Sequence, residues 1–168
     1  MSLFITFQHI VPQHLLSRGV GRLAASENTF VKNTFIKNFA AKYQVNMAEA
    51  LEENPLAYKS FNDFFTRVLK PNARPIAADS KAIISPADGA ISQIGAITAD
   101  KIFQAKGHDY SVTTLLGGDE QRAAAFVGGQ FATVYLSPKD YHRVHMPFTG
   151  KLTQMIYVPG DLFSVNTT

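Results

Sequence analysis

Residues 82–97, AIISPADGAISQIGAI, mark the point where the pattern of the sequence changes. From Ala90 onward, apolar residues alternate with small or polar ones directly after the break at Gly89, which is typical of a strand with one buried face. Similar patterns recur at residues 131–136 and 151–158, and a short helix is expected at 112–116. The sequence therefore predicts a body of strands over residues 82–168.

The sequence before this body has the periodicity of helices. Over residues 1–51, apolar side chains recur at intervals of three or four positions, the spacing of one face of an α-helix. They fall into three groups: Leu3, Phe4, Phe7, Ile10 and Val11; Leu15, Leu16, Val20 and Leu23; and Val31, Phe35, Phe39 and Tyr43. Amphipathic helices followed by mainly antiparallel strands give an α+β fold class.

A connector at residues 52–81 joins the helical segment to the β-rich body. Its apolar residues with the spacing of a short helix are Phe61, Phe64, Phe65 and Leu69. Ser60, with Asp63 three positions later, is the expected N-cap of that helix. The chain thus divides into a helical segment at 1–51, the connector at 52–81 and the body at 82–168.

The composition is that of a folded protein. Of the 168 residues, 46% are hydrophobic and 17% are charged, so the chain can bury a core. Cysteine does not occur in the sequence, which excludes disulfides and thiolate metal sites within it. No apolar run approaches the roughly 20 residues that a membrane-spanning helix requires. We therefore expect a soluble or peripheral protein.

Positive charge is concentrated near the N-terminus, although the net charge is only +3. The basic residues up to position 42 are Arg18, Arg22, Lys32, Lys37 and Lys42, and Glu27 is the only acid among them. Such an excess favours contact with an anionic surface, either lipid headgroups or nucleic acid. Because the charge lies on apolar helices and not on an aromatic-lined strand face, the pattern argues against nucleic acid.

Two histidines, His142 and His145, are the first candidates for chemistry. Three positions apart, they would share one face of a helical turn but point to opposite sides of a strand. A partly buried imidazole titrates near neutrality and can transfer protons if another group fixes its tautomer. A purely structural role as polar loop residues explains the pair equally well.

Asp88 lies between a Pro-Ala turn and a glycine, where its carboxylate can be held rigidly. A carboxylate so placed can orient a histidine, as in a Ser-His-Asp triad, although Asp-Gly is also a common turn pair.

Lys106 either binds a carboxylate or phosphate or belongs to a solvated hairpin turn. The histidines with Asp88 and Asp140 also permit a metal site, as in a metal-dependent hydrolase built on His142, His145 and a carboxylate. Because they lack the His-Glu-x-x-His pattern, we expect no metal.

Five motifs in a fixed order give the chain a resemblance to a known family. They are SFNDFFTRVL at 60–69 followed by RPI at 74–76, PADG at 86–89, KGHDY at 106–110 followed by Leu115-Leu116, LSPKDYHRVHMP at 136–147, and PGDLFSVN at 159–166. Together they resemble the phosphatidylserine decarboxylase family over nearly the whole chain. The motif at 136–147 is highly specific.

The resemblance implies roles for individual residues. His145 would be the base of a self-cleavage triad and Asp88 would orient it, whereas His142 would serve in decarboxylation and Lys106 and Tyr141 in substrate binding. The third triad member in the family is a serine in a Gly-Ser pair, and its attack on the preceding carbonyl leads to a covalent pyruvoyl cofactor. Through a Schiff base with that group, phosphatidylserine would lose carbon dioxide and become phosphatidylethanolamine.

The family pattern is incomplete here, because the 168 residues contain no Gly-Ser pair. The resemblance places the serine that becomes the pyruvoyl group beyond Thr168, so we expect no cofactor-binding residue within this chain. We therefore expect a proenzyme fragment that is inactive by itself and whose β body is incomplete.

The resemblance also implies what the complete enzyme would contact. It would have four partners: phosphatidylserine, an anionic membrane surface, the pyruvoyl-bearing α chain and further copies of itself. It would be a peripheral protein on the cytoplasmic face of the cell membrane. The alternatives are a metal-dependent hydrolase that uses His142 and His145, and a non-enzymatic basic lipid-binding module.

Overall fold

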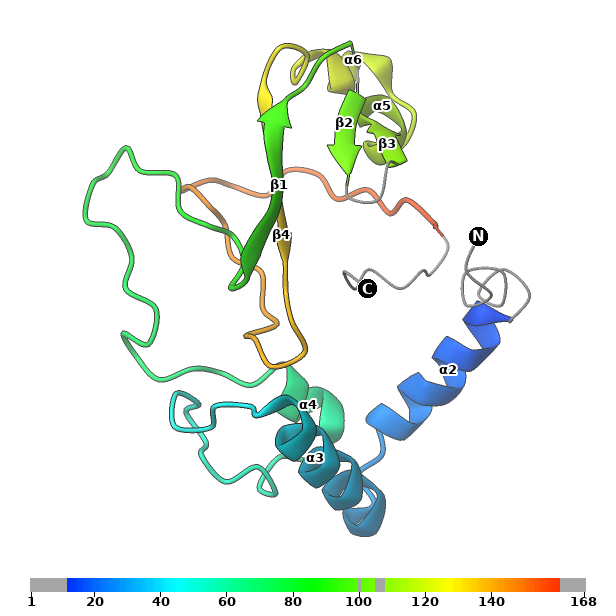
Figure 1. Ribbon diagram of the computed structural model, residues 1–168, viewed down its shortest axis with the longest axis vertical. Helices are drawn as coiled ribbons and strands as arrows, with labels where there is room; N and C mark the ends of the chain where they lie inside the picture. The colour runs from blue at the N-terminus through cyan, green and yellow to red at the C-terminus, as the bar shows by residue number, and fades with distance from the viewer. Residues whose placement is uncertain (1–11, 100, 105–107, 161–168) are drawn as a thin grey trace.

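The computed structural model describes residues 12–99, 101–104 and 108–160 of the chain. Figure 1 shows helices at one end and two small strand pairs with short helices at the other, linked by long segments without regular structure. Both strand pairs are antiparallel. The predicted α+β fold class is therefore confirmed, with helices first and antiparallel strands after them.

Two helices open the described chain, α2 at Gln13–Ala24 and α3 at Thr29–Tyr43. Asn28 caps α3, because its side-chain oxygen accepts hydrogen bonds from two backbone N–H groups of the first turn at 3.1 and 3.2 Å. Gln44 ends α3 in a left-handed conformation with a φ of 53°. The periodicity predicted both helices, whereas the apolar group at residues 3–11 lies outside the described residues.

A short helix in the connector, α4 at Phe61–Phe65, completes the core of the helical part. Ser60 caps it as predicted, since its hydroxyl accepts a hydrogen bond from the N–H of Asp63 at 3.2 Å and donates to the carboxylate of Asp63 at 3.0 Å. Phe64 and Ile36 are fully buried at the contact between α4 and α3. The side chains that pack around them include Phe39, Leu56, Tyr58 and Phe65.

The central strand pair consists of β1 at Ala90–Ala96 and β4 at Gln130–Tyr135. Both strands were predicted from their alternating sequence. The antiparallel register pairs Ala90 with Tyr135, so the start of β1 lies beside the end of β4. The chain segments before β1 and after β4 therefore leave at the same end of the pair, which faces α4 (Figure 1).

A second small unit lies at the other end of β1. It contains the hairpin of β2 at Lys101–Gln104 and β3 at His108–Ser111, followed by α5 at Val112–Leu115 and α6 at Glu120–Ala124. Its hydrophobic cluster is built on the buried residues Ile97, Val112 and Ala123. The short helix α5 was predicted, but the sequence patterns did not predict β2, β3 or α6.

The predicted strand at residues 151–158 is wrong, because this segment has no regular secondary structure. Over residues 155–158 the alternation is still visible in the exposed fractions, which are 87% and 86% for Met155 and Tyr157 but 43% and 42% for Ile156 and Val158. The two less exposed side chains line a hollow with Leu115 of α5, Leu116 and Arg122 of α6. Alternation therefore reports one-sided packing here, and no strand in the described part of the chain pairs with the segment.

Candidate functional site

The β1–β4 pair brings Asp88 next to the histidine loop, by which we mean residues 136–147. β1 begins two residues after Asp88, and β4 ends one residue before the loop. Two backbone hydrogen bonds continue the antiparallel arrangement beyond the strands. The N–H of His145 donates to the carbonyl of Pro86 at 2.8 Å, and the N–H of Ile84 donates to the carbonyl of Pro147 at 3.0 Å. The segments that contain Asp88 and His145 therefore lie side by side.

Gly89 permits this close approach. A Cβ atom at Gly89 would lie 2.3 Å from the carbonyl oxygen of Tyr135 and 3.1 Å from Cγ1 of Val134. Since the nearer of these atoms belongs to the backbone, a side chain at position 89 would push β1 and β4 apart. The glycine that follows Asp88 in the sequence thus has a packing function beyond that of a turn.

The Asp88 carboxylate is held by Arg74 through both of its oxygens. Nε of Arg74 donates to Oδ1 at 3.0 Å and Nη2 donates to Oδ2 at 2.7 Å. These hydrogen bonds are the main cause that lowers the pKa of Asp88 below its usual value; partial burial opposes them, and a backbone hydrogen bond from Tyr141 adds to them. Asp88 is therefore an ionised carboxylate at neutral pH, with its orientation fixed by Arg74.

His145 is exposed, and its imidazole is engaged by Tyr141. Nε2 of His145 lies 3.0 Å from the hydroxyl of Tyr141, and the two rings stack with centroids 5.5 Å apart. No hydrogen bond joins the Asp88 carboxylate to the His145 imidazole, both of which belong to the described chain. The two residues thus lie on adjacent backbone segments, while their side chains have other partners.

His142 is half-buried against the helical part of the protein. Its ring stacks on Phe65 of α4, with centroids 4.0 Å apart and an angle of 22° between the ring planes. Nε2 lies 3.0 Å from the carbonyl oxygen of Ser137. Because a carbonyl only accepts, Nε2 must carry the proton in this contact, and Nδ1 of the neutral ring is then the acceptor. The contact therefore fixes the tautomer of His142.

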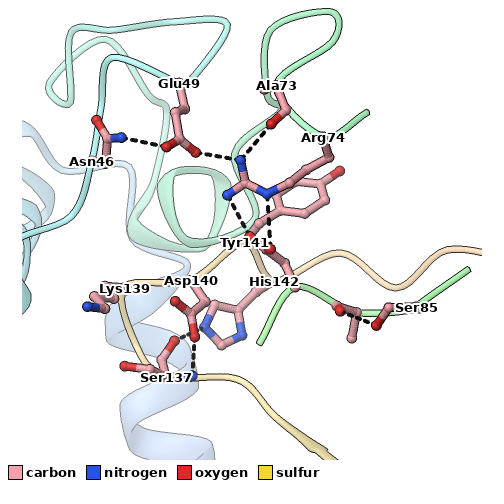
Figure 2. Close-up of polar contacts among 12 residues, drawn as sticks. Asn46, Glu49, Ala73, Arg74, Ser85, Ser137, Lys139, Asp140, Tyr141 and His142 are labelled. Atoms are coloured by element: carbon pink, nitrogen blue, oxygen red, sulfur yellow. Dashed lines mark hydrogen bonds and ion pairs between the residues drawn. The ribbon is translucent and has the colours of Figure 1, made fainter. Parts of the chain in front are cut away.

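Two arginines attach the histidine loop to the chain around α4. Nη2 of Arg67 donates to the carbonyl of Lys139 at 2.8 Å, and Nε of Arg143 donates to the carbonyl of Thr66 at 2.7 Å. The Arg67 residue is only 4% exposed, and burial lowers the pKa of its guanidinium. Figure 2 shows the turn at the start of the loop, where the carboxylate of Asp140 accepts a hydrogen bond from the N–H of Ser137 at 2.7 Å.

Sequence reasoning missed Arg67 and Arg74 as members of the site. Both lie in motifs that carried the family resemblance, SFNDFFTRVL and RPI, but nothing in their local pattern indicated which groups they would contact. The signal that could have found them is therefore the motif itself, and their partners follow only from the tertiary structure.

The predictions about substrate binding and the cofactor have different outcomes. Of the two predicted substrate-binding residues, Tyr141 contacts His145 through its hydroxyl, whereas Lys106 lies outside the described residues. Thr168, beyond which the pyruvoyl serine is expected, also lies outside the described residues. The position of that serine relative to His145 therefore stays a prediction.

Other kinds of site have less support. No group of three or more His, Asp or Glu side chains could hold a metal ion among residues 12–99, 101–104 and 108–160, so the metal-dependent alternative finds no ligand set there. An apolar hollow of about 410 Å³ lies in the β-rich body. Its lining contains none of Asp88, Tyr141, His142 and His145. The candidate site is therefore the loop region at the α4 end of the strand pair.

Comparison with known proteins identifies close relatives of the chain. The family model described as phosphatidylserine decarboxylase matches residues 61–168, and a model described as PSD matches residues 3–44. The phosphatidylserine decarboxylase proenzyme of Bordetella avium is 60% identical over 164 residues, which are 98% of this chain and 56% of that protein. The proenzyme of Saccharophagus degradans is 61% identical over 98% of this chain and 57% of its own length. The chain thus spans about half the length of the curated relatives it matches.

Proposed function

The chain belongs to the phosphatidylserine decarboxylase family, and from this premise we propose that the full-length protein is a self-cleaving carboxy-lyase that converts phosphatidylserine to phosphatidylethanolamine. The motif resemblance and the matches agree on this family. The relatives are named as proenzymes, which supports a precursor that is processed before it acts.

The pairing of the segments around Asp88 and His145 carries the proposal. His145 acts as the base that removes the proton from a serine hydroxyl supplied by the rest of the protein, and Asp88 orients the imidazole and stabilises its charged form. Three observations support these roles: the 2.8 Å backbone hydrogen bond from His145 to Pro86, the lowered pKa of Asp88 and the exposure of the His145 side chain. In this role the His145 ring turns from the Tyr141 hydroxyl toward Asp88 when the serine segment docks.

The histidine loop has groups suited to a pyruvoyl site. A pyruvoyl group supplies the carbonyl that accepts the electron pair released when carbon dioxide leaves. His142 and Tyr141 would line it. Since the proton of His142 is held on Nε2 by the Ser137 carbonyl, Nδ1 is the atom of this ring that would accept and return a proton. Tyr141 and Lys106 are proposed to bind the substrate.

The helical segment is proposed to hold the protein on the cytoplasmic face of the cell membrane. Four apolar side chains of α2 are between 47% and 69% exposed: Leu15, Leu16, Val20 and Leu23. On a helix with 3.6 residues per turn they form one stripe, and the exposed Arg18 and Arg22 fall along one edge of it. An apolar stripe beside cations suits the interface of an anionic bilayer. No described helix is long and apolar enough to cross a membrane.

The proposal also gives the three sequence segments different tasks. Residues 1–51 would contact the membrane, residues 52–81 would connect, and residues 82–168 would contribute the catalytic body. The shared core of α3 and α4 supports a helical segment and connector that move together. After cleavage the chain that contains these residues would stay bound to the pyruvoyl-bearing α chain, and further copies of the protein would be additional partners.

Self-cleavage of the full-length protein tests the proposal. We expect wild-type protein to separate into two chains on a denaturing gel, with a pyruvoyl group at one new N-terminus by mass spectrometry. His145→Ala and Asp88→Asn should slow the cleavage by about 10²–10⁴-fold, the range for loss of a general base or of the group that orients it.

His142→Ala is the matched control for this experiment. We expect it to cleave normally but to release little carbon dioxide from phosphatidylserine vesicles, because it acts after the cofactor has formed. Cleavage of His145→Ala at the wild-type rate would contradict the proposal. Wild-type protein that binds the vesicles without cleavage or carbon dioxide release would instead support the non-enzymatic lipid-binding module.

A further inference from the structure

Arg74 links three parts of the chain through one guanidinium group. We infer that Arg74 is a positioning residue for self-cleavage, which holds both oxygens of Asp88 and thereby fixes the direction in which this carboxylate faces the histidine loop. The inference rests on the proposed function, because it assigns to Arg74 the task of preparing Asp88 for its role toward His145.

The geometry of the Arg74–Asp88 pair is suited to orientation. Nε and Nη2 lie on one edge of the planar guanidinium, and they donate to Oδ1 and Oδ2 at 3.0 and 2.7 Å. Two parallel hydrogen bonds of this kind fix the plane of the carboxylate as well as its position. A carboxylate offers about four acceptor sites, so sites remain on Asp88 for a histidine N–H.

Arg74 is itself fixed by the helical part of the protein, as Figure 2 shows. Nη1 donates to Oε2 of Glu49 at 2.7 Å and to the carbonyl of Ala73 at 2.8 Å. The other oxygen of Glu49 accepts a hydrogen bond from Nδ2 of Asn46 at 2.6 Å. In addition, the backbone carbonyl of Glu49 accepts a hydrogen bond from the N–H of Lys70 at 2.8 Å. The guanidinium of Arg74 is thus held by Glu49 and by the Ala73 carbonyl, independently of its contacts with Asp88.

Because the Arg74–Asp88 pair is partly exposed, we expect it to orient the carboxylate without contributing much to folding stability. The side chains of Arg74 and Asp88 are 46% and 27% exposed, and ion pairs at such positions contribute little to the free energy of folding because water screens them. The other charged or polar groups that act on Asp88 are the more distant cation of Arg67 and the backbone of Tyr141. Loss of Arg74 should therefore affect cleavage much more than stability.

The test compares Arg74→Gln, Arg74→Lys and the control Arg122→Gln in the full-length protein. Arg74→Gln should slow self-cleavage by about 10²-fold, the effect of misplacing a reacting group by roughly 1 Å. Arg74→Lys should rescue the rate only in part, because an ammonium group keeps the charge but cannot form the two parallel hydrogen bonds. Arg122→Gln, the matched control, removes a comparable partly exposed ion pair, that of Arg122 in α6 with Asp119, and should change the rate by less than about threefold.

A spectroscopic measurement distinguishes positioning from a structural role. In a non-cleaving His145→Ala background, carboxyl carbon NMR should show that the pKa of Asp88 rises when Arg74 is replaced by Gln, while the melting temperature changes little. The inference would be overturned if the melting temperature of Arg74→Gln fell far enough for loss of folded protein to explain the slower cleavage. Cleavage of Arg74→Lys at the wild-type rate would overturn it too.

The outcome for Asp88→Asn separates the two proposals. If Asp88→Asn cleaves at the wild-type rate, the proposed function of Asp88 fails and the role of Arg74 fails with it. If Asp88→Asn is blocked while Arg74→Gln cleaves at the wild-type rate, the proposed function stands and only the inference about Arg74 is overturned.

Discussion

At the scale of single residues, the site depends on side chains that fix one another in pairs. Arg74 fixes Asp88 through two hydrogen bonds, and the Ser137 carbonyl fixes the tautomer of His142. Gly89 contributes through the absence of a side chain, since the carbonyl of Tyr135 occupies the space that a Cβ would need. Each of these contacts places a polar group without adding much to the hydrophobic core.

The substitution Gly89→Ala tests the role of that space. We expect it to destabilise the protein by about 1–3 kcal/mol, the usual effect of inserting atoms into a filled position, and to slow self-cleavage because Asp88 moves with β1. Gly19→Ala is the matched control. Apart from the backbone of α2 itself, no atom of the described residues lies within 4 Å of a Cβ at Gly19, and the change should stabilise α2 by about 0.5–1 kcal/mol. Urea unfolding measures the free energy of unfolding of both variants. Equal changes in Gly89→Ala and Gly19→Ala would contradict the packing role of Gly89.

At the scale of secondary-structure elements, α2 and α3 both lie near the N-terminus but bury different side chains. α3 contributes the fully buried Ile36 to the core, whereas the one buried residue of α2 is Ala24. The leucines of α2 are exposed instead. A deletion of residues 1–43 would therefore remove core packing together with the exposed stripe. Substitutions on α2 test membrane contact more specifically.

The triple variant Leu15→Ser, Leu16→Ser and Leu23→Ser should weaken flotation with anionic vesicles by about tenfold or more. The reason is the loss of apolar area that would otherwise leave water, at about 25 cal/mol for each Å². The folding stability should change little. Leu152→Ser is the control, because Leu152 is 74% exposed and lies far from α2 in the sequence. Unchanged binding by the triple variant would contradict a membrane role of α2.

At the scale of the whole molecule, the helical part supports the histidine loop. α4 provides Phe65, on which His142 stacks, and the residues that follow it provide Thr66 and Arg67, which bond to the histidine loop. α4 in turn is anchored by Phe64, which is fully buried against the cluster that includes Ile36. The position of His142 thus depends on a core formed by another part of the chain.

Phe64→Ala should show this dependence. We expect a loss of about 3–5 kcal/mol in the free energy of unfolding, typical of removing a buried phenylalanine, and a changed NMR signal of the His142 ring. Phe30→Ala removes the same atoms from a residue that is 80% exposed and should change stability by less than about 0.5 kcal/mol. An unchanged His142 signal in Phe64→Ala would argue against support from α4.

The local features of the fold were predictable from the sequence. The periodicity of Leu15 to Leu23 and of Val31 to Tyr43 predicted α2 and α3, Ser60 with Asp63 predicted the cap of α4, and alternation predicted β1 and β4. These signals depend on interactions over a few residues, so the sequence contains them in full. The order of the motifs likewise identified the family and named Asp88, His142 and His145 as candidates.

The contacts of those candidates depended on the tertiary structure. Arg74 is 14 residues from Asp88, and Arg143 is 77 residues from the Thr66 carbonyl to which it donates. The segment at 151–158 shows the same limit, since its alternation is real but a strand also requires a partner. Local propensity determines which element a segment favours; the packing of distant segments determines which polar groups meet, because that depends on where the folded core places them.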